Sequence, residues 1–171
     1  TDVGTGCGVL AYMLCRAGFT KVLATDNNPN AIESVSRDLQ RTPAPIEPLL
    51  GDLLEPCDTT DLIVFNPPWI LGEQMNPLDG ALYFEDGLFA RFFDQACTRI
   101  SSTGRVVIVF SNVLSLVHPE VPHPIETELE RGRFKLVQKL QRKVKPPPSK
   151  HGKRRRTKEK VEIWELALAD N

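Results

Sequence analysis

The four residues Asn66, Pro67, Pro68 and Trp69 form the segment of the sequence that is most typical of a chemical site. Two successive prolines fix two φ angles, so this turn is rigid and can hold a side-chain amide and a main-chain carbonyl in one orientation. A planar amino group that donates to the Asn66 side-chain oxygen and the Pro67 carbonyl would become more pyramidal and more nucleophilic. Trp69 adds an aromatic face, whose stacking on a base is worth about 1–3 kcal/mol. We therefore expect these residues to bind and orient the amino group of a substrate. The alternative is a structural turn with a packed tryptophan.

A second candidate is the glycine-rich segment near the start of the chain, where Gly4, Gly6 and Gly8 alternate with Thr5 and Cys7. Such glycines remove side chains from a turn, so backbone N–H groups and the positive end of a following helix can approach a ligand closely. The spacing differs from the Gly-x-Gly-x-x-Gly pattern of dinucleotide sites, which disfavours a nicotinamide dehydrogenase. A tight turn without a ligand is the structural alternative.

Two acidic residues indicate a nucleoside ligand. Asp26 ends a predicted strand 24 residues after Asp2, where a carboxylate can accept both hydroxyl protons of a ribose. Asp52 and the main-chain N–H of Leu53 follow the next strand candidate and could read the edge of an adenine. The alternative for Asp26 is that it only forms a turn, and the alternative for Asp52 is that it is an acidic residue of an exposed loop without a ligand.

The elements that must position these residues follow from hydrophobic periodicity. Short apolar runs alternate with helical patterns, which is typical of a mostly parallel sheet covered by helices. The predicted strands are 21–25, 46–50, 61–65, 105–110, 134–140 and 161–168, and the predicted helices are 9–17, 30–40, 84–100 and 125–132. Asn30 is expected to cap the second helix. Segment 70–83 has no regular pattern, and the last two strands are expected to pair in an antiparallel manner.

The start of the chain leaves little room for a strand. Only Thr1, Asp2 and Val3 precede the glycine-rich turn, whereas strands usually have about five or six residues. We expect a shortened first strand in a single domain, residues 1–171, that is a fragment lacking its N-terminal part.

Composition excludes several classes of protein. The chain is 41% hydrophobic and 25% charged, which is ordinary globular usage and excludes fibrous or wholly disordered proteins. No apolar window is long enough for a membrane helix and the first residues do not form a signal peptide, so we expect a cytoplasmic protein with no membrane contact. The four cysteines are scattered without metal-ligand spacing, which predicts free thiols and no metal.

Positive charge is concentrated near the end of the chain. Residues 131–160 contain 14 Lys and Arg residues and a single acidic residue, Glu159. The basic loop Lys145–Lys160 is expected to contact nucleic acid, RNA in preference to DNA, through phosphate contacts that need no particular sequence. A solvated surface loop and a localisation signal are the alternatives, and a protein substrate is the alternative partner.

Four motifs together resemble those of class I S-adenosylmethionine-dependent methyltransferases. They are Asp2–Gly8, Thr25–Ala31, Gly51–Pro56 and Asn66–Trp69, and the resemblance covers residues 2–115 well. The chain is most similar to the Asn-Pro-Pro-aromatic group, the small-domain or HemK-like enzymes. Members of this group methylate amino groups of adenine or guanine in nucleic acids, or the glutamine amide of translation release factors.

The resemblance implies an α/β fold, a Rossmann-like seven-stranded sheet with the final strand antiparallel and helices on both faces. It implies S-adenosylmethionine as cofactor and transfer of its methyl group to an exocyclic amine of a nucleobase, with adenine in RNA or DNA as the first expectation. A glutamine methyltransferase of the release-factor-modifying type and a catalytically silent binding module are the alternatives. It places residues around the methionine end (Asp2, Gly4, Thr5, Gly6, Gly8), at the ribose (Asp26, Asn27), at the adenine (Asp52, Leu53) and between cofactor and substrate (Asn66).

Overall fold

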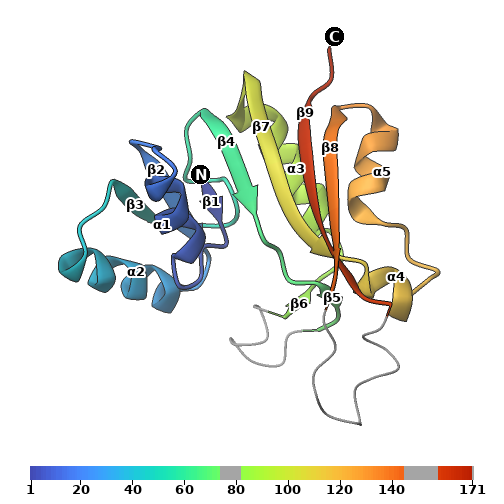
Figure 1. The fold of residues 1–171 in the computed structure, drawn as a ribbon, viewed down its shortest axis with the longest axis horizontal. Coiled ribbons are helices and arrows are strands. Elements are labelled where there is room, and N and C mark those ends of the chain that lie inside the picture. The colour runs from blue at the N-terminus through green and yellow to red at the C-terminus, as the bar shows by residue number, and fades with distance from the viewer. Residues whose placement is uncertain (74–81, 145–157, 171) are drawn as a thin grey trace.

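The computed structural model, which describes residues 1–73, 82–144 and 158–170, contains one seven-stranded sheet (Figure 1). The strand order is β3-β2-β1-β4-β7-β9-β8. The strands are β1 (Asp2–Val3), β2 (Val22–Asp26), β3 (Ile46–Leu50), β4 (Thr60–Phe65), β7 (Ile100–Ser111), β8 (Phe134–Lys143) and β9 (Lys160–Leu168). Strands β1, β2, β3, β4 and β7 pair in parallel, whereas β9 pairs antiparallel with both β7 and β8. This confirms the predicted fold class; strand β1 has two residues.

Helices cover both faces of this sheet. Helices α1 (Val9–Arg16) and α2 (Pro29–Arg41) pack over β2 and β3, whereas α3 (Leu88–Arg99) and α5 (Pro124–Arg131) contact β7 and β8. Two separate clusters of buried side chains fill the two interfaces. Ala24 belongs to the first cluster and its neighbour Leu23 packs against the second, as expected because successive strand residues face opposite sides.

The helix starts follow capping chemistry, and one prediction is wrong. Helix α2 begins at Pro29, and its N-cap is Asn28 rather than Asn30. The Asn28 side-chain oxygen accepts the main-chain N–H of Asn30 at 3.0 Å, and a proline at the first helical position loses no hydrogen bond. Helix α5 ends at Arg131, and the following Gly132, with a φ of 76° in the left-handed region, is its C-cap.

The segment after the Pro-Pro turn differs most from the prediction. Residues Ile70–Leu71 (β5) and Tyr83–Phe84 (β6) pair as a small parallel sheet, although segment 70–83 was predicted to be irregular and Phe84 to be helical. Helix α3 begins only at Leu88, because Gly87 has a φ of 90° that a helix cannot include. A further short helix, α4 (Val113–Val117), was not predicted, and β7 begins at Ile100 instead of residue 105.

A buried carboxylate fastens the β8 side of the sheet to the helical layer. The side chain of Glu128 on α5 is only 2% exposed, and its two oxygens accept hydrogen bonds from Nε and Nη2 of Arg133 at 2.6 and 2.7 Å. Arg133 Nη1 also donates to Asp94 on α3 at 2.6 Å. Hydrogen bonding to Glu128 raises the pKa of Arg133 above its already high value, so the guanidinium stays charged. Arg131 contributes a longer contact to Glu128, at 3.5 Å.

The substitution Arg133→Met should lower the free energy of unfolding by about 3 kcal/mol, because it leaves the buried Glu128 carboxylate with only the distant Arg131. Urea unfolding followed by circular dichroism measures this change. The matched control is Arg37→Met, which breaks an exposed pair with Glu33 and should change stability by no more than about 0.5 kcal/mol. Equal effects of the two substitutions would contradict the role given to Glu128.

Candidate active site

Strand register brings the glycine-rich turn, Asp26 and Asn66 to the same edge of the sheet. Val3 on the central strand β1 pairs with Thr25 on one side and with Phe65 on the other. The next residues, Gly4, Asp26 and Asn66, therefore leave three adjacent parallel strands at the same level. The strand order runs outward in opposite directions from β1, and ligands of open α/β sheets bind at such a switch point beyond the carboxyl ends.

Asp2 lies beneath the glycine-rich turn and holds it in place. Its side chain is buried, and Oδ2 accepts hydrogen bonds from Thr5 Oγ1 at 2.7 Å and from the Ala11 main-chain N–H at 3.0 Å. Burial raises the pKa of this carboxyl group, while the hydrogen bonds from Thr5 and Ala11 act in the opposite direction. Asp2 and Thr5 thus connect strand β1, the turn and helix α1, and this connection fixes the shape of the turn.

The turn itself has the conformation that its glycines permit. Gly6 and Gly8 have φ angles of 54° and 79°, and a Cβ at Gly8 would lie 3.0 Å from Val35 Cγ2 on α2. A Cβ at Gly6 would meet no atom within 4 Å, so this part of the turn is open to a ligand. Gly8 therefore serves packing against α2. A Cβ at Gly4 would lie 3.8 Å from Phe65 Cε2, so of these three glycines Gly6 lines the open side.

Asp26 is oriented by main-chain donors on both sides. Its Oδ2 accepts the N–H of Gly6 at 2.9 Å, and its Oδ1 accepts the N–H of Asn28 at 2.8 Å. A carboxylate has about four acceptor positions, so each oxygen can still accept a ligand hydroxyl. Asn27, between them, is exposed beside the carboxylate. This geometry fits the predicted contact with a ribose.

The loop that follows β3 has an unusual backbone. Leu53 is the one non-glycine residue with positive φ (53°) in the described part of the chain. Its carbonyl accepts the Thr25 hydroxyl at 2.7 Å, and Gly51 N–H donates to the Asp26 carbonyl at 3.1 Å. No described residue accepts the N–H of Leu53, which is 8% exposed. A main-chain donor left without a partner next to the Asp52 carboxylate fits the predicted contact with an adenine edge.

Two residues of α3 at this loop were missed by the sequence reasoning. Gln95 Oε1 accepts the Leu54 N–H at 2.6 Å, and Arg91 Nε lies 3.4 Å from Asp52 Oδ2. Periodicity shows which face of α3 is apolar, but Arg91 and Gln95 lie on its border. The one signal in the sequence is that Arg91 and Gln95 are four residues apart, about one helical turn, so their side chains lie on the same side of the helix and can contact the same loop.

The Pro-Pro turn presents Asn66 to the open edge of the sheet. Asn66 is exposed and its side-chain amide has no hydrogen bond to the residues that the structure describes, whereas Pro67 is buried. Trp69 is half-buried, packs against the main core and donates from Nε1 to the Val109 carbonyl at 3.3 Å. The turn is thus anchored by its prolines and by Trp69, and Asn66 is available to a ligand.

Basic residues gather at the same edge of the sheet. Strands β7 and β8 run in the same direction, so the end of β8, with Arg142 and Lys143, lies on the side where β4 and β7 end. Asn112, just after β7, accepts from the Lys160 N–H at 2.7 Å and donates to the Lys158 carbonyl at 3.2 Å. Most of the predicted basic loop, residues 145–157, lies outside the described residues.

Within residues 1–73, 82–144 and 158–170, no group of three or more His, Cys, Asp or Glu side chains is arranged to hold a metal ion. No helix there is long and apolar enough to span a membrane. The cytoplasmic location stays a prediction.

The fold and the site define a class I methyltransferase, whose cofactor is S-adenosylmethionine. Residues 1–138 match the family described as the methyltransferase small domain, and the chain belongs to this family. This confirms the predicted enzyme class, cofactor and HemK-like group. The residue roles proposed for the cofactor and acceptor site stay predictions.

Curated relatives match only part of their own length. Release factor glutamine methyltransferase of Bacillus subtilis (strain 168) is 35% identical over 94 residues, which is 52% of this chain and 33% of that protein. The enzyme of the same name from Lactococcus lactis subsp. lactis (strain IL1403) is 26% identical over 121 residues, 63% of this chain and 45% of that protein. The chain therefore spans less than half the length of these relatives.

Solved structures share the fold at low identity. A ribosomal protein L11 methylase from Lactobacillus delbrueckii subsp. bulgaricus aligns with 99% of this chain and 69% of that one, at a TM-score of 0.64 and 19% identity. The tRNA m1G37 methyltransferase of M. jannaschii aligns with 99% of this chain and 44% of that one, at a TM-score of 0.63 and 16% identity. These matches show a common fold.

The substitution Thr5→Val should destabilise the protein by about 1–3 kcal/mol at neutral pH, because the Asp2 carboxylate loses a donor in a buried site. Burial raises the folded-state pKa of Asp2 above its ordinary value of 3.8. The stability contributed by Asp2 is therefore present below that value and is lost as the pH rises through the folded pKa. Losing the Thr5 donor raises the pKa further, so the cost of Thr5→Val should grow with pH.

Urea unfolding at about pH 4 and about pH 7 measures this dependence. Thr5→Ser is the matched control, because it keeps the hydroxyl group and should show a small, pH-independent change. An equal cost of Thr5→Val at both pH values would mean that Asp2 is not the group affected.

Proposed function

We propose that this chain is the catalytic domain of an N-methyltransferase that acts on a planar amino nitrogen. The observation that supports this most directly is the register of β1, β2 and β4, which aligns the glycine-rich turn, Asp26 and Asn66 at one edge. A rigid pair of hydrogen-bond acceptors then lies beside the proposed cofactor pocket. This juxtaposition suits an amine acceptor better than it suits hydride transfer.

Each part of S-adenosylmethionine can be assigned to residues of the chain. Asp26 would bind the ribose hydroxyls, and Asp52 with the Leu53 N–H would bind the adenine. The glycine-rich turn, open at Gly6, would receive the methionine end. When bound, the cofactor supplies an electrophilic methyl group on a positively charged sulfur.

The acceptor would be held by Asn66 and Pro67. The Asn66 side-chain oxygen and the Pro67 carbonyl each accept one N–H of the amino group, which directs the nitrogen lone pair away from them and toward the cofactor pocket. Because the two prolines fix the turn, alignment is present before the substrate binds, and orientation alone can lower the barrier by several kcal/mol, up to about 7–11. Asn66 is exposed, so the proton released after transfer can pass to solvent.

We infer that the acceptor is the side-chain amide of a glutamine in a protein. Relatives that are 35% identical over 94 residues and 36% identical over 88 residues carry the name release factor glutamine methyltransferase. The hydrogen bond from Trp69 to Val109 and its packing on the core leave the indole only half exposed, which limits its use as a stacking surface for a base. An amide needs no such surface.

A nucleobase amine, the acceptor first expected from the sequence, is the second candidate. Arg142, Lys143, Lys158 and Lys160 lie at the edge where Asn66 lies, and adjacent strands are about 4.8 Å apart. Strands β9 and β8 are two and three strands from β4, so Lys160, Arg142 and Lys143 are roughly 10–15 Å from Asn66 across the sheet and two to three residues further along the strand direction. This spacing suits phosphates close to a bound base.

Labelling separates the two acceptors. The protein is incubated with methyl-tritiated S-adenosylmethionine and with cell extract divided into protein and RNA fractions. We expect label in the protein fraction, released as methylamine when the amide is hydrolysed in acid. Label in methylated adenine of RNA would overturn the glutamine assignment in favour of the second candidate. Cofactor binding without label in either fraction would indicate a silent binding module.

The substitution Asn66→Ala should lower the single-turnover transfer rate by about 10²–10³-fold, because one of the two acceptors for the amino group is lost. The dissociation constant of the cofactor, measured by calorimetry, should change less than about threefold. Asn30→Ala, an exposed asparagine on α2, is the matched control and should leave both values unchanged. Transfer at the normal rate in Asn66→Ala would remove Asn66 from the mechanism.

A further inference from the structure

Helix α3 contacts the proposed adenine loop with two polar side chains. Arg91 and Gln95 are one helical turn apart, and both reach the segment Gly51–Leu54. Gln95 accepts the Leu54 N–H at 2.6 Å, and Arg91 Nε lies 3.4 Å from Asp52 Oδ2. The loop and the helix are about 40 residues apart in the chain, so these contacts are a product of the tertiary fold.

The hydrogen bonds of this loop leave the Leu53 N–H and an oxygen of Asp52 available to a ligand. The Leu53 carbonyl is bonded to the Thr25 hydroxyl and the Leu54 N–H is bonded to Gln95. The N–H of Leu53 is among the loop donors for which no described residue is the acceptor. On Asp52, the contact with Arg91 involves Oδ2, and Oδ1, which has no partner among the described residues, is the acceptor assigned to a ligand.

Arg91 holds two acidic residues at once. Its Nη2 donates to Glu85 Oε1 at 2.9 Å while its Nε faces Asp52. Glu85 directly follows β6, which pairs with β5, the strand that begins directly after Trp69. The planar guanidinium has several donors in a fixed arrangement, so it can fix the direction of both carboxylates in a way that a lysine ammonium cannot.

We propose that Arg91 is a positioning residue that gives the site its preference for adenine over a 6-oxo purine. Arg91 holds Asp52 so that Oδ1 accepts a hydrogen from the exocyclic amine, while the Leu53 N–H donates to a ring nitrogen. A 6-oxo purine places an oxygen opposite the carboxylate and a hydrogen opposite the Leu53 N–H, so both contacts become repulsive. This inference rests on the proposed cofactor roles of Asp52 and Leu53.

The test compares two ligands that differ only in the base. S-adenosylhomocysteine and its deaminated analogue S-inosylhomocysteine are titrated into the protein and into Arg91→Met, with binding measured by calorimetry. In the unchanged protein, S-adenosylhomocysteine should bind at least tenfold more tightly. In Arg91→Met, the affinity for S-adenosylhomocysteine should fall roughly tenfold, because the charge-assisted hydrogen bond between Asp52 and the base is lost. The affinity for S-inosylhomocysteine should change less than about threefold.

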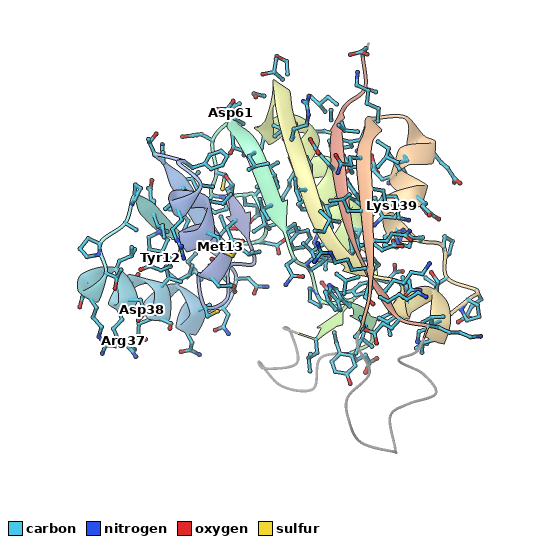
Figure 2. All side chains as sticks on the ribbon, viewed as in Figure 1. Tyr12, Met13, Arg37, Asp38, Asp61 and Lys139 are labelled. Carbon is cyan, nitrogen blue, oxygen red and sulfur yellow. The ribbon has the colours of Figure 1, made fainter. Side chains whose placement is uncertain are left out.

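Three controls make the outcome specific. Arg91→Lys keeps the positive charge without the planar guanidinium, and it should recover part of the preference for S-adenosylhomocysteine. Glu85→Gln removes the other ion pair of Arg91 and should retain the preference. Arg37→Met removes an exposed arginine from α2, distant from α3 in Figure 2, and should change neither affinity.

The outcomes distinguish this proposal from the function on which it rests. A parallel loss of affinity for both ligands in Arg91→Met would show that Arg91 only braces the loop, and would overturn the positioning role. An unchanged preference would overturn it as well. If the unchanged protein bound S-adenosylhomocysteine without preferring it to the analogue, the assignment of Asp52 and Leu53 would fail while the methyltransferase proposal stood. If it bound neither ligand, the proposed function itself would fail.

Discussion

The buried carboxylate of Asp2 is the interaction on which the geometry of the site depends. It connects strand β1, the hydroxyl of Thr5 in the turn and the first turn of α1 through two hydrogen bonds. A carboxylate in such a place costs free energy unless its acceptor positions are used, so the turn has one arrangement that satisfies it. Because β1 is central among β2, β1 and β4, the same arrangement determines where Asp26 and Asn66 lie relative to Gly6.

The sequence predicts those parts of the fold that depend on local pattern. The strands at 21–25 and 61–65 are found within one residue, because buried parallel strands have continuous apolar runs. The start of β7 is not predictable in this way, since residues 101–103 are polar and partly exposed, and only Gly104, whose added Cβ would lie 3.0 Å from the Asp61 carbonyl, allows the close approach of β4. The strands β5 and β6 have two residues each, too few to show a period.

The candidate site, like the fold, is predicted only in part by the sequence. The order of the motifs predicts which strand ends carry Asp26, Asp52 and Asn66, because parallel strands end at one edge. It does not predict that Asp2 is buried beneath the turn, nor that Arg91 and Gln95 reach the loop after β3, since these contacts join distant segments. Helix α3 thus has two functions: its phenylalanines fill the core, and its polar border shapes the proposed cofactor pocket.

The antiparallel hairpin of β8 and β9 has a consequence for how such enzymes diversify. Asn112 fastens the loop end of the hairpin to the end of β7, and Glu128 with Arg133 fastens the start of β8 to the helices. Both attachments use residues at or next to the strand ends and none of residues 145–157, so the connection between β8 and β9 can change its length and charge without altering strand register. The segment proposed to contact the substrate can then change in evolution while the proposed catalytic residues stay the same.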